Sequence, residues 1–259
     1  MDIHNKKCFI FDLDGTVYMG DQPIQGTIDF IKKKMPDHSI FFMTNNTSKT
    51  PEIYVERLKK FDIHIHIDQI ISPFIPLFKY LKKNKIRYMY LMANKSVEDY
   101  VRKLLPDIDC TDDISKCEVI VMTFDTELNY EKLKTASLLL QNKPSIKYVA
   151  THPDNVCPTD KGNIPDVGGF MKIIEMTANR VPDVIFGKPS TELLTSILES
   201  YKKEECAIVG DRIYTDKKLA DNSGIDFVLV LSGETTIDSV NDLREAPSYI
   251  VKDMGIFNT

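Results

Sequence analysis

The sequence lacks the cysteine pattern of a secreted, disulfide-stabilised domain. Its five cysteines are scattered, their number is odd, and no two of them form a CxxC pair. Disulfide frameworks use even numbers of cysteines, whereas scattered cysteines are typical of proteins from a reducing compartment. The same scatter gives no support to a thiol-based transition-metal site.

Long apolar runs are absent as well. No segment approaches the roughly 18 apolar residues of a membrane span, and the first residues contain no stretch of signal-peptide length. We therefore expect a cytoplasmic protein with no membrane partner.

The chain also lacks an excess of basic residues. Lys and Arg number 33 against 38 Asp and Glu, which gives a formal net charge of -5 and no electrostatic footprint for nucleic acid. The lysine clusters fall near the ends of expected helices, where cations stay solvated and complement the helix dipole. DNA and RNA are therefore not expected partners.

No internal repeat, low-complexity tract or flexible linker interrupts the 259 residues, which can form one large domain or two ordinary ones. Short apolar runs alternate with helix-period segments, which predicts βα units and a mainly parallel sheet. A second domain would be an insertion joined by short hinges, with candidates at 84–85 and 181–183. The expected strands are 7–11, 39–43, 87–92, 118–122, 147–150, 184–186, 207–209 and 227–231.

Polar residues follow four of these strands. The first strand delivers Asp12 and Asp14 into a turn at Gly15, and buried carboxylates cost several kcal/mol unless a cation meets them. Ligands of open α/β sheets bind beyond the carboxyl ends of the strands, so these positions are where function is expected. Carboxylates, a lysine, hydroxyls and amides collected there suit Mg²⁺ together with a phosphoryl group. The other three strand ends carry Thr44-Asn45-Asn46, Gly187-Lys188-Pro189-Ser190 and Gly210-Asp211-Arg212, with Asp216 close behind.

The four segments resemble, in order and spacing, the four motifs of haloacid dehalogenase (HAD) superfamily phosphatases. Segments 150–155, 187–190, 210–216 and 231–236 further resemble the NagD-like branch, which carries a C2-type cap. The resemblance covers nearly the whole chain. It implies an α/β fold with a doubly wound parallel-sheet, HAD Rossmann-like core at 1–84 and 183–259, and an inserted α/β C2 cap at 85–182.

Carried over by position, the resemblance implies that Asp12 attacks phosphorus and becomes an aspartyl phosphate. Asp14 would protonate the leaving alcohol and then activate water, and its carbonyl would face the metal. Mg²⁺ would be held by Asp12, Asp14 and Asp211, while Asp216 would support the site. Alternatively, Asp216 is an ordinary acid in the first turn of a helix.

Thr44, Asn45 and Asn46 would donate hydrogen bonds to the phosphoryl group, and Lys188 would offset its charge. Two structural alternatives stay open here. The Thr44-Asn45-Asn46 segment could cap the following helix, and Lys188 could be a solvated loop lysine.

The expected cap contains three candidate substrate residues, Asp154, Asn155 and Asp166. The glycines in 165–169 either let the backbone approach a ligand or form a tight turn. His152 lies nearby, but no direct catalytic role is expected for it. No arginine cluster marks a nucleotide, so a small phosphorylated metabolite such as a sugar phosphate is the expected partner.

The resulting hypothesis is a Mg²⁺-dependent phosphomonoester hydrolase that is a monomer or a cap-mediated homodimer. Two alternatives remain: a non-catalytic phosphometabolite-binding protein, or another HAD enzyme such as a phosphotransferase. The pair Asp12 and Asp14 argues against both a pure binder and a dehalogenase, since neither needs both carboxylates.

Overall fold

The computed structural model describes residues 2–159, 161–240 and 246–258. It divides the chain into two compact units. The first comprises Met1–Thr44, Pro51–Ile71 and Lys188–Thr259, and the second comprises Asn45–Thr50 and Ser72–Gly187. The chain therefore passes between the units four times, and residues 72–84 and 183–187 group with the inserted unit, outside the boundaries expected from the sequence.

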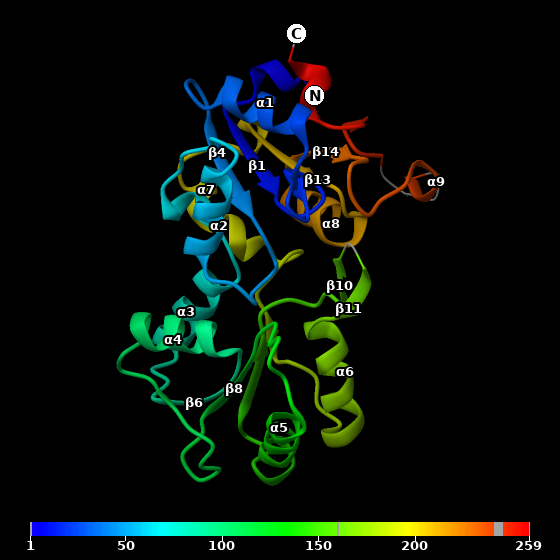
Figure 1. Cartoon of the computed structure of the whole chain (residues 1–259). Helices are drawn as coiled ribbons and strands as arrows, with labels where there is room; N and C mark the ends of the chain where they lie inside the picture. The colour runs from blue at the N-terminus through cyan, green and yellow to red at the C-terminus, as the bar shows by residue number, and fades with distance from the viewer. Residues whose placement is uncertain (1, 160, 241–245, 259) are drawn as a thin grey trace. The chain divides into compact units, whose positions relative to one another are not determined.

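The first unit is built on a six-stranded, fully parallel sheet with the strand order β15-β14-β13-β1-β4-β5. The central strand β1 pairs with β4 on one side and with β13 on the other, and β5 lies beyond β4 while β14 and β15 lie beyond β13, so the sheet is doubly wound (Figure 1). The strands are β1 (Cys8–Asp12), β4 (Ser39–Met43), β5 (Ile70–Ile71), β13 (Cys206–Gly210), β14 (Asp226–Val230) and β15 (Tyr249–Val251).

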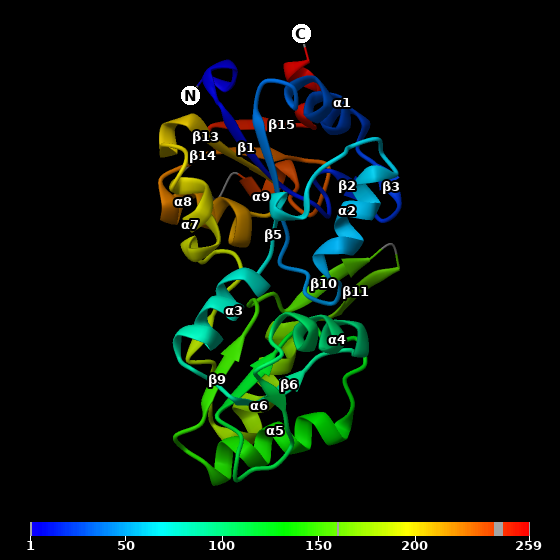
Figure 2. The same cartoon turned by 90° about the vertical axis from the view of Figure 1, so that its left-hand side faces the viewer.

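Helices cover both faces of this sheet (Figure 2). The unit also contains a short β2–β3 hairpin, 3-10 turns at Ile3–Asn5, Ile67–Gln69, Thr191–Leu194, Lys203–Glu205 and Met254–Phe257, and a π-helical turn at Ile213–Lys217. The remaining elements are β2 (Tyr18–Met19), β3 (Gln22–Pro23), α1 (Gln25–Lys34), α2 (Pro51–Lys59), α7 (Thr195–Leu198), α8 (Lys218–Ser223) and α9 (Ile237–Val240).

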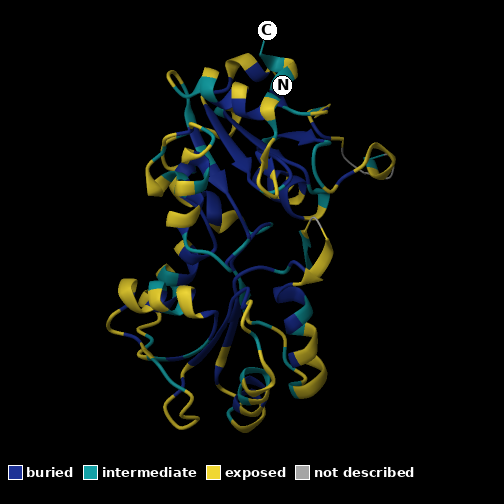
Figure 3. Cartoon of the chain, viewed as in Figure 1, coloured by how far each residue is buried: buried dark blue, intermediate teal, exposed yellow. Residues whose placement is uncertain are grey.

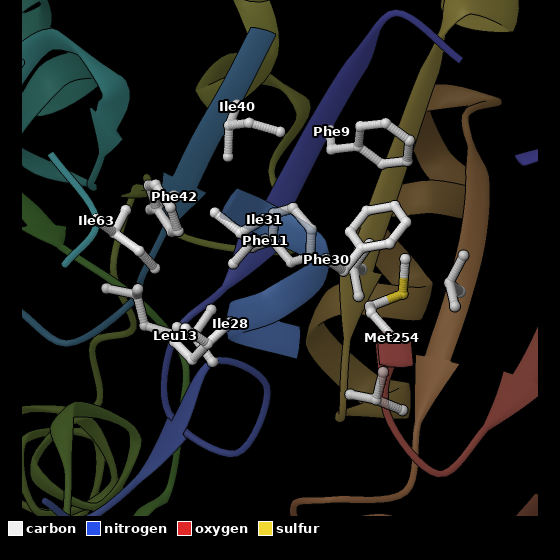
Figure 4. Close-up of a cluster of buried hydrophobic side chains, with 14 of the residues drawn as sticks. Phe9, Phe11, Leu13, Ile28, Phe30, Ile31, Ile40, Phe42, Ile63 and Met254 are labelled. Carbon is white, nitrogen blue, oxygen red and sulfur yellow. The ribbon is translucent and has the colours of Figure 1, made fainter. Parts of the chain in front are cut away.

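Strand β1 is buried on both faces, as its continuous apolar run predicts. Phe9 and Phe11 point to the face covered by α1, where Phe30 packs edge-on against Phe9 at a ring-centroid distance of 5.2 Å (Figure 4). Ile10 points to the opposite face, in a cluster with residues of α7 and α8 such as Leu219. The alternation fixes the register of β1 and therefore the position of the residues that follow it.

The second unit has its own five-stranded parallel sheet, in the order β12-β9-β8-β6-β7, and a separate β10–β11 hairpin. Strands β1 and β13 of the first sheet and β8 of the second are buried along their whole length, whereas the edge strands β7 and β12 are intermediate or exposed (Figure 3). The elements of this unit are α3 (Phe74–Lys83), β6 (Tyr88–Met92), α4 (Lys95–Leu104), β7 (Asp109–Cys110), β8 (Val119–Met122), α5 (Tyr130–Asn142), β9 (Lys147–Ala150), β10 (Val156–Thr159), β11 (Gly162–Pro165), α6 (Val167–Ala178) and β12 (Val184–Ile185).

Helix α3 shows why the inserted unit begins earlier than residue 85. Its apolar side chains Phe74, Leu77 and Leu81 are buried in one cluster with Met89 of β6 and Val97 of α4. A helix belongs to the unit whose core buries its apolar face, and that core is the core of the second unit.

All eight expected strands are present, each within one residue of its expected ends. A 3-10 turn at Thr191–Leu194 directly precedes the four-residue α7. The strands that the sequence did not indicate, β2, β3, β5, β7, β10, β11 and β15, are two to four residues long. None of the helices in the described part of the chain has both the length and the apolar character that a membrane span needs.

Replacing the core aromatic ring of α1 tests this packing. Phe30→Ala should lower the free energy of unfolding by about 3–5 kcal/mol, because a fully buried ring leaves a cavity. Urea denaturation measures the loss. Tyr130→Ala, at a position that is 75% exposed, is the aromatic control and should change stability by less than about 0.5 kcal/mol. A similar small change for Phe30→Ala would contradict the packing.

Candidate active site

The predicted catalytic residues of the first unit meet at the point where the strand order reverses. Asp12 is the last residue of β1, and Asp211 directly follows the neighbouring β13. Thr44 follows β4 on the other side of β1. In an open parallel sheet, this switch point at the carboxyl ends of the strands is where ligands bind.

Lys188 joins two of the aspartates. Its ammonium group donates to Asp12 Oδ1 and to Asp216 Oδ1, the latter at 2.6 Å, and its side chain is only 3% exposed. Burial alone would lower the pKa of Lys188, but the charges of Asp12 and Asp216 outweigh it and raise that pKa. Lys188 is thus a buried, protonated cation, and the alternative of a solvated loop lysine is wrong.

Asp216 is placed by the turn that follows β13. The π-helical turn Ile213–Lys217 directs its carboxylate inward, where Oδ2 accepts from the backbone N–H of Arg212 at 3.1 Å. A Cβ at Gly210 would come too close to this side chain, which explains the glycine there. Asp216 is 1% exposed, so it is not an ordinary surface acid of a helix.

Asp211 is buried among like charges. Burial, and then the charges of Asp12 and Asp216, raise the pKa of Asp211 well above its ordinary value. Burial and Asp12 also raise the pKa of Asp216, against the opposing effect of Lys188. The ionised cluster therefore carries more negative charge than its protein surroundings neutralise.

The residues present fit a divalent cation. One carboxylate oxygen from each of Asp12, Asp211 and Asp216 lies within 4.8 Å of the others. Together with Lys188, the three carboxylates have a formal charge of -2, which a divalent cation balances. Hard oxygen ligands of this kind are those that Mg²⁺ prefers.

Asp14 lies in the turn that follows β1 and is partly exposed. The backbone N–H of Gly15 donates to the carbonyl of Tyr18 at 2.7 Å, which closes the turn. Gly15 has a φ of 93°, in the left-handed region that favours glycine. The turn holds Asp14 two residues beyond Asp12.

Sequence reasoning missed a set of residues that hold Asp211. The backbone N–H of Glu234 donates to Asp211 Oδ2 at 2.7 Å, and the hydroxyl of Thr16 lies 3.4 Å from Oδ1. Glu234 belongs to the segment 231–236 after β14, which the sequence marked only through the family resemblance. Gly233 in this segment was the available signal, because a glycine after a strand often marks a close backbone approach.

The expected phosphate-binding segment is divided between the two units. Thr44, which is buried, belongs to the first unit, where its N–H donates to the carbonyl of Ile71 at 3.0 Å. Asn45 and Asn46 belong to the second. There the side-chain amide of Asn45 lies 3.3 Å from both carboxylate oxygens of Asp154.

Segment Asn45–Thr50 lies along the carboxyl edge of the second unit's sheet. The hydroxyl of Thr47 contacts that of Thr151 at 2.9 Å and accepts from the N–H of Phe124 at 3.0 Å. The side-chain amide of Asn94 donates to the carbonyl of Ser48 at 2.9 Å. The residues therefore form part of a loop fixed to this sheet rather than the start of α2.

The candidate cap residues surround a buried hydrogen-bond chain. His152 contacts Thr151 Oγ1 through Nδ1 at 3.0 Å and Asp166 Oδ1 through Nε2 at 2.9 Å. Asp166 also accepts from the N–H of Val167 at 2.6 Å and begins α6, so its carboxylate is engaged inside the second unit. Asp154 is buried as well, whereas Asn155 is exposed.

Gly168 lies within α6 and brings the helix against the segment that carries Asp154. Its N–H donates to the carbonyl of Asp154 at 2.7 Å, and a Cβ there would overlap the carbonyl oxygen of Pro153. Gly168 thus lies in a helix and allows a close approach of the protein's own backbone, which neither of the two alternatives stated above describes.

Comparison with known proteins agrees with this architecture. A family model described as haloacid dehalogenase-like hydrolase matches residues 9–104, and a second HAD hydrolase-like model matches 185–255. The crystal structure of 4-nitrophenylphosphatase from Thermotoga maritima is 33% identical, with a TM-score of 0.87 over 97% of this chain and 95% of that chain. The chain belongs to the HAD hydrolase superfamily.

Other relatives place it within the NagD-like branch of HAD phosphatases. An acid sugar phosphatase of Staphylococcus haemolyticus is 28% identical over 97% of this chain and 95% of the relative. A solved structure described as a putative nagD protein is 33% identical, with a TM-score of 0.85 over 99% of this chain and 98% of that chain. Three predictions from the sequence are therefore confirmed: the HAD family, the α/β fold and the enzyme class, a phosphatase.

The charge of the HAD carboxylate cluster predicts an unusual substitution effect. The pKa of Asp211 is higher in the folded state than in the unfolded state, so ionised Asp211 destabilises the fold. This destabilisation is complete above the folded-state pKa and absent below the unfolded-state pKa. In EDTA at pH 8, Asp211→Asn should therefore raise Tm, by about 2–4 °C for each 1 kcal/mol relieved. The gain should shrink toward pH 4. Differential scanning calorimetry measures it.

Asp37→Asn is the control for this experiment, because Asp37 is an exposed carboxylate of the same unit. It should leave Tm unchanged at both pH values. A lower Tm for Asp211→Asn at pH 8 would contradict the electrostatic argument.

Proposed function

We propose that this HAD phosphatase is a Mg²⁺-dependent phosphomonoester hydrolase that acts on a small phosphorylated metabolite, such as a sugar phosphate, through an aspartyl phosphate on Asp12. The observation that carries the proposal is the cluster of Asp12, Asp211 and Asp216 around buried Lys188 at the switch point of the sheet. The relatives named acid sugar phosphatase and 4-nitrophenylphosphatase support the substrate class.

In the first step, a carboxylate oxygen of Asp12 attacks phosphorus, and the bond between phosphorus and the leaving oxygen breaks. Asp14, in its protonated form, gives its proton to that oxygen, which leaves as an alcohol. Its position in the turn directly after the nucleophile supports this role.

In the second step, water attacks the phosphorus of the aspartyl phosphate. Asp14, now ionised, accepts a proton from the water, and the bond between phosphorus and Asp12 breaks. Inorganic phosphate leaves, and both carboxyl groups return to their starting protonation states. One side chain thereby serves as acid and then as base.

Lys188 and the segment after β4 bind the transferring group. The ammonium of Lys188 already contacts Asp12, so it holds the nucleophile and offsets charge on the phosphoryl oxygens. Thr44, Asn45 and Asn46 donate to those oxygens. Positioning and charge stabilisation of this kind supply most of the catalysis in phosphoryl transfer.

Asp12, the carbonyl of Asp14 and Asp211 would hold Mg²⁺, with Asp216 supporting the site. When bound, the ion neutralises negative charge on the phosphoryl oxygens and the carboxylates. The formal charge of -2 around Lys188 supports a divalent cation at this place.

The second unit would act as a C2-type cap that excludes water and contacts the leaving group. Asp154 and Asn155 are the proposed substrate residues of this cap. Asp166 is proposed to support them, because its carboxylate bonds to His152 and caps α6. A cytoplasmic location and a monomer or cap-mediated homodimer stay predictions.

The nucleophile is tested with Asp12→Asn. With Mg²⁺ and p-nitrophenyl phosphate, or a panel of sugar phosphates, the wild type should release phosphate and the variant should lose about 10³-fold or more of kcat. Asp37→Asn is the exposed control and should retain wild-type activity. Equal rates for wild type and Asp12→Asn would overturn the proposed enzyme.

The acid and base role is tested with Asp14→Asn. The substitution keeps the backbone carbonyl, so Mg²⁺ affinity measured by calorimetry should stay close to that of the wild type. Turnover should fall about 10²–10⁴-fold, the usual contribution of general acid–base catalysis. Equal losses of Mg²⁺ binding and turnover would contradict the assigned role.

A further inference from the structure

We propose that the loop after β14, residues 232–235, is a positioning element that holds the carboxylate of Asp211 against the turn after β1. The inference rests on the Mg²⁺ site proposed above. It assigns a role to Ser232 and Gly233, two residues outside the catalytic set.

The loop donates hydrogen bonds to both the side chain and the backbone of Asp211. The N–H of Glu234 donates to Oδ2 of Asp211 at 2.7 Å, and the N–H of Thr235 donates to its carbonyl oxygen at 3.3 Å. Hydrogen bonds to a carboxylate are stronger than those between neutral groups and fix its orientation. Consecutive residues of the loop thus restrain the carboxylate and its main chain together.

Two glycines from different loops make room for this carboxylate. A Cβ at Gly233 or at Gly15 would overlap the side chain of Asp211. Gly15 needs to be glycine also because of its φ of 93°, but Gly233 has no such backbone requirement. The glycine at 233 is therefore explained by the closeness of the Asp211 side chain.

Ser232 ties the loop to the turn that carries Asp14. Its hydroxyl donates to the carbonyl of Gly15 at 2.7 Å, one residue beyond Asp14. One loop therefore contacts both Asp211 and the turn after Asp12. Because Mg²⁺ demands near-ideal octahedral geometry, the separation of these carboxylates affects how tightly the ion binds.

The loop is itself braced from the segment after β13. The carboxylate of Glu234 forms an ion pair with Arg212, whose Nε lies 3.1 Å away, and accepts a hydrogen bond from the hydroxyl of Tyr214 at 2.9 Å. Arg212 directly follows Asp211 in the sequence. Glu234 therefore contacts the same segment whose carboxylate, that of Asp211, the loop positions. These contacts limit independent movement of the loop and the segment.

The test is a calorimetric titration of MgCl₂ alone into the full-length protein. Ser232→Ala should weaken Mg²⁺ binding about tenfold, as loss of a group that orients metal ligands does. Ser232→Thr keeps the hydroxyl donor and should retain wild-type affinity. Gly233→Ala should weaken binding at least as much as Ser232→Ala. Ser239→Ala, at an exposed position of α9, is the control and should have no effect.

A positioning role also has a kinetic signature. The Mg²⁺ concentration that gives half-maximal activity should rise about tenfold in Ser232→Ala, while kcat returns toward the wild-type value at saturating Mg²⁺. Tm in EDTA should stay close to wild type, because the bond lies at the edge of the fold and not in its core. A lower Tm with unchanged Mg²⁺ dependence would mean a purely structural role and would overturn the inference.

The outcomes separate the inference from the proposed function. If the wild type binds Mg²⁺ and Asp211→Asn does not, but Ser232→Ala and Gly233→Ala bind like the wild type, the inference is wrong and the function stands. If the wild type binds no Mg²⁺, both fail. Should Ser232→Ala not fold, Gly233→Ala decides, since it keeps Ser232 and alters only the space beside Asp211.

Discussion

The first unit is organised around one electrostatic constraint, namely three buried carboxylates that share a single buried ammonium group. Lys188 contacts Asp12 and Asp216, while burial, and then the charges of those two aspartates, raise the pKa of Asp211. Such a cluster costs folding free energy, which burial of apolar side chains on both faces of the parallel sheet offsets. The repulsion that weakens the fold is the same property that favours a divalent cation, so stability and function oppose each other here.

Three glycines of this unit follow from that constraint. Gly15, Gly210 and Gly233 each lie where a Cβ would overlap an aspartate of the cluster. Gly15 and Gly233 lie in the loops after β1 and β14, and Gly210 is the last residue of β13; the strand order places these three strand ends side by side. The carboxylates are thus packed against backbone on several sides, and their geometry depends on loops as much as on the strands that carry them.

The sequence predicted the strand ends well, because long apolar runs define strands and parallel neighbours bring their carboxyl ends to one edge. For this reason Asp12 and Asp211 belong to the same cluster, although they lie far apart in the chain. The seven strands that the sequence did not indicate have only two to four residues, too few for a periodic signal. The start of the second unit was misplaced because α3 has the apolar face of any core helix, and only its packing partners decide which core buries it. The contact of Glu234 with Asp211 was missed because it uses a backbone N–H, which every residue except proline offers.

The segment after β4 shows how a short stretch serves two units at once. Thr44 is bonded to the backbone of the first unit, while the side chain of the next residue, Asn45, is oriented by Asp154 of the second. A peptide bond joins the two residues, so the orientation of one limits the conformations open to the other. Asp154 therefore has an effect on Asn45 that does not require any contact with a substrate. A substitution of Asp154 that altered the binding of inorganic phosphate, which has no leaving group, would act through Asn45, whereas one that altered only discrimination among phosphate esters would act on the leaving group.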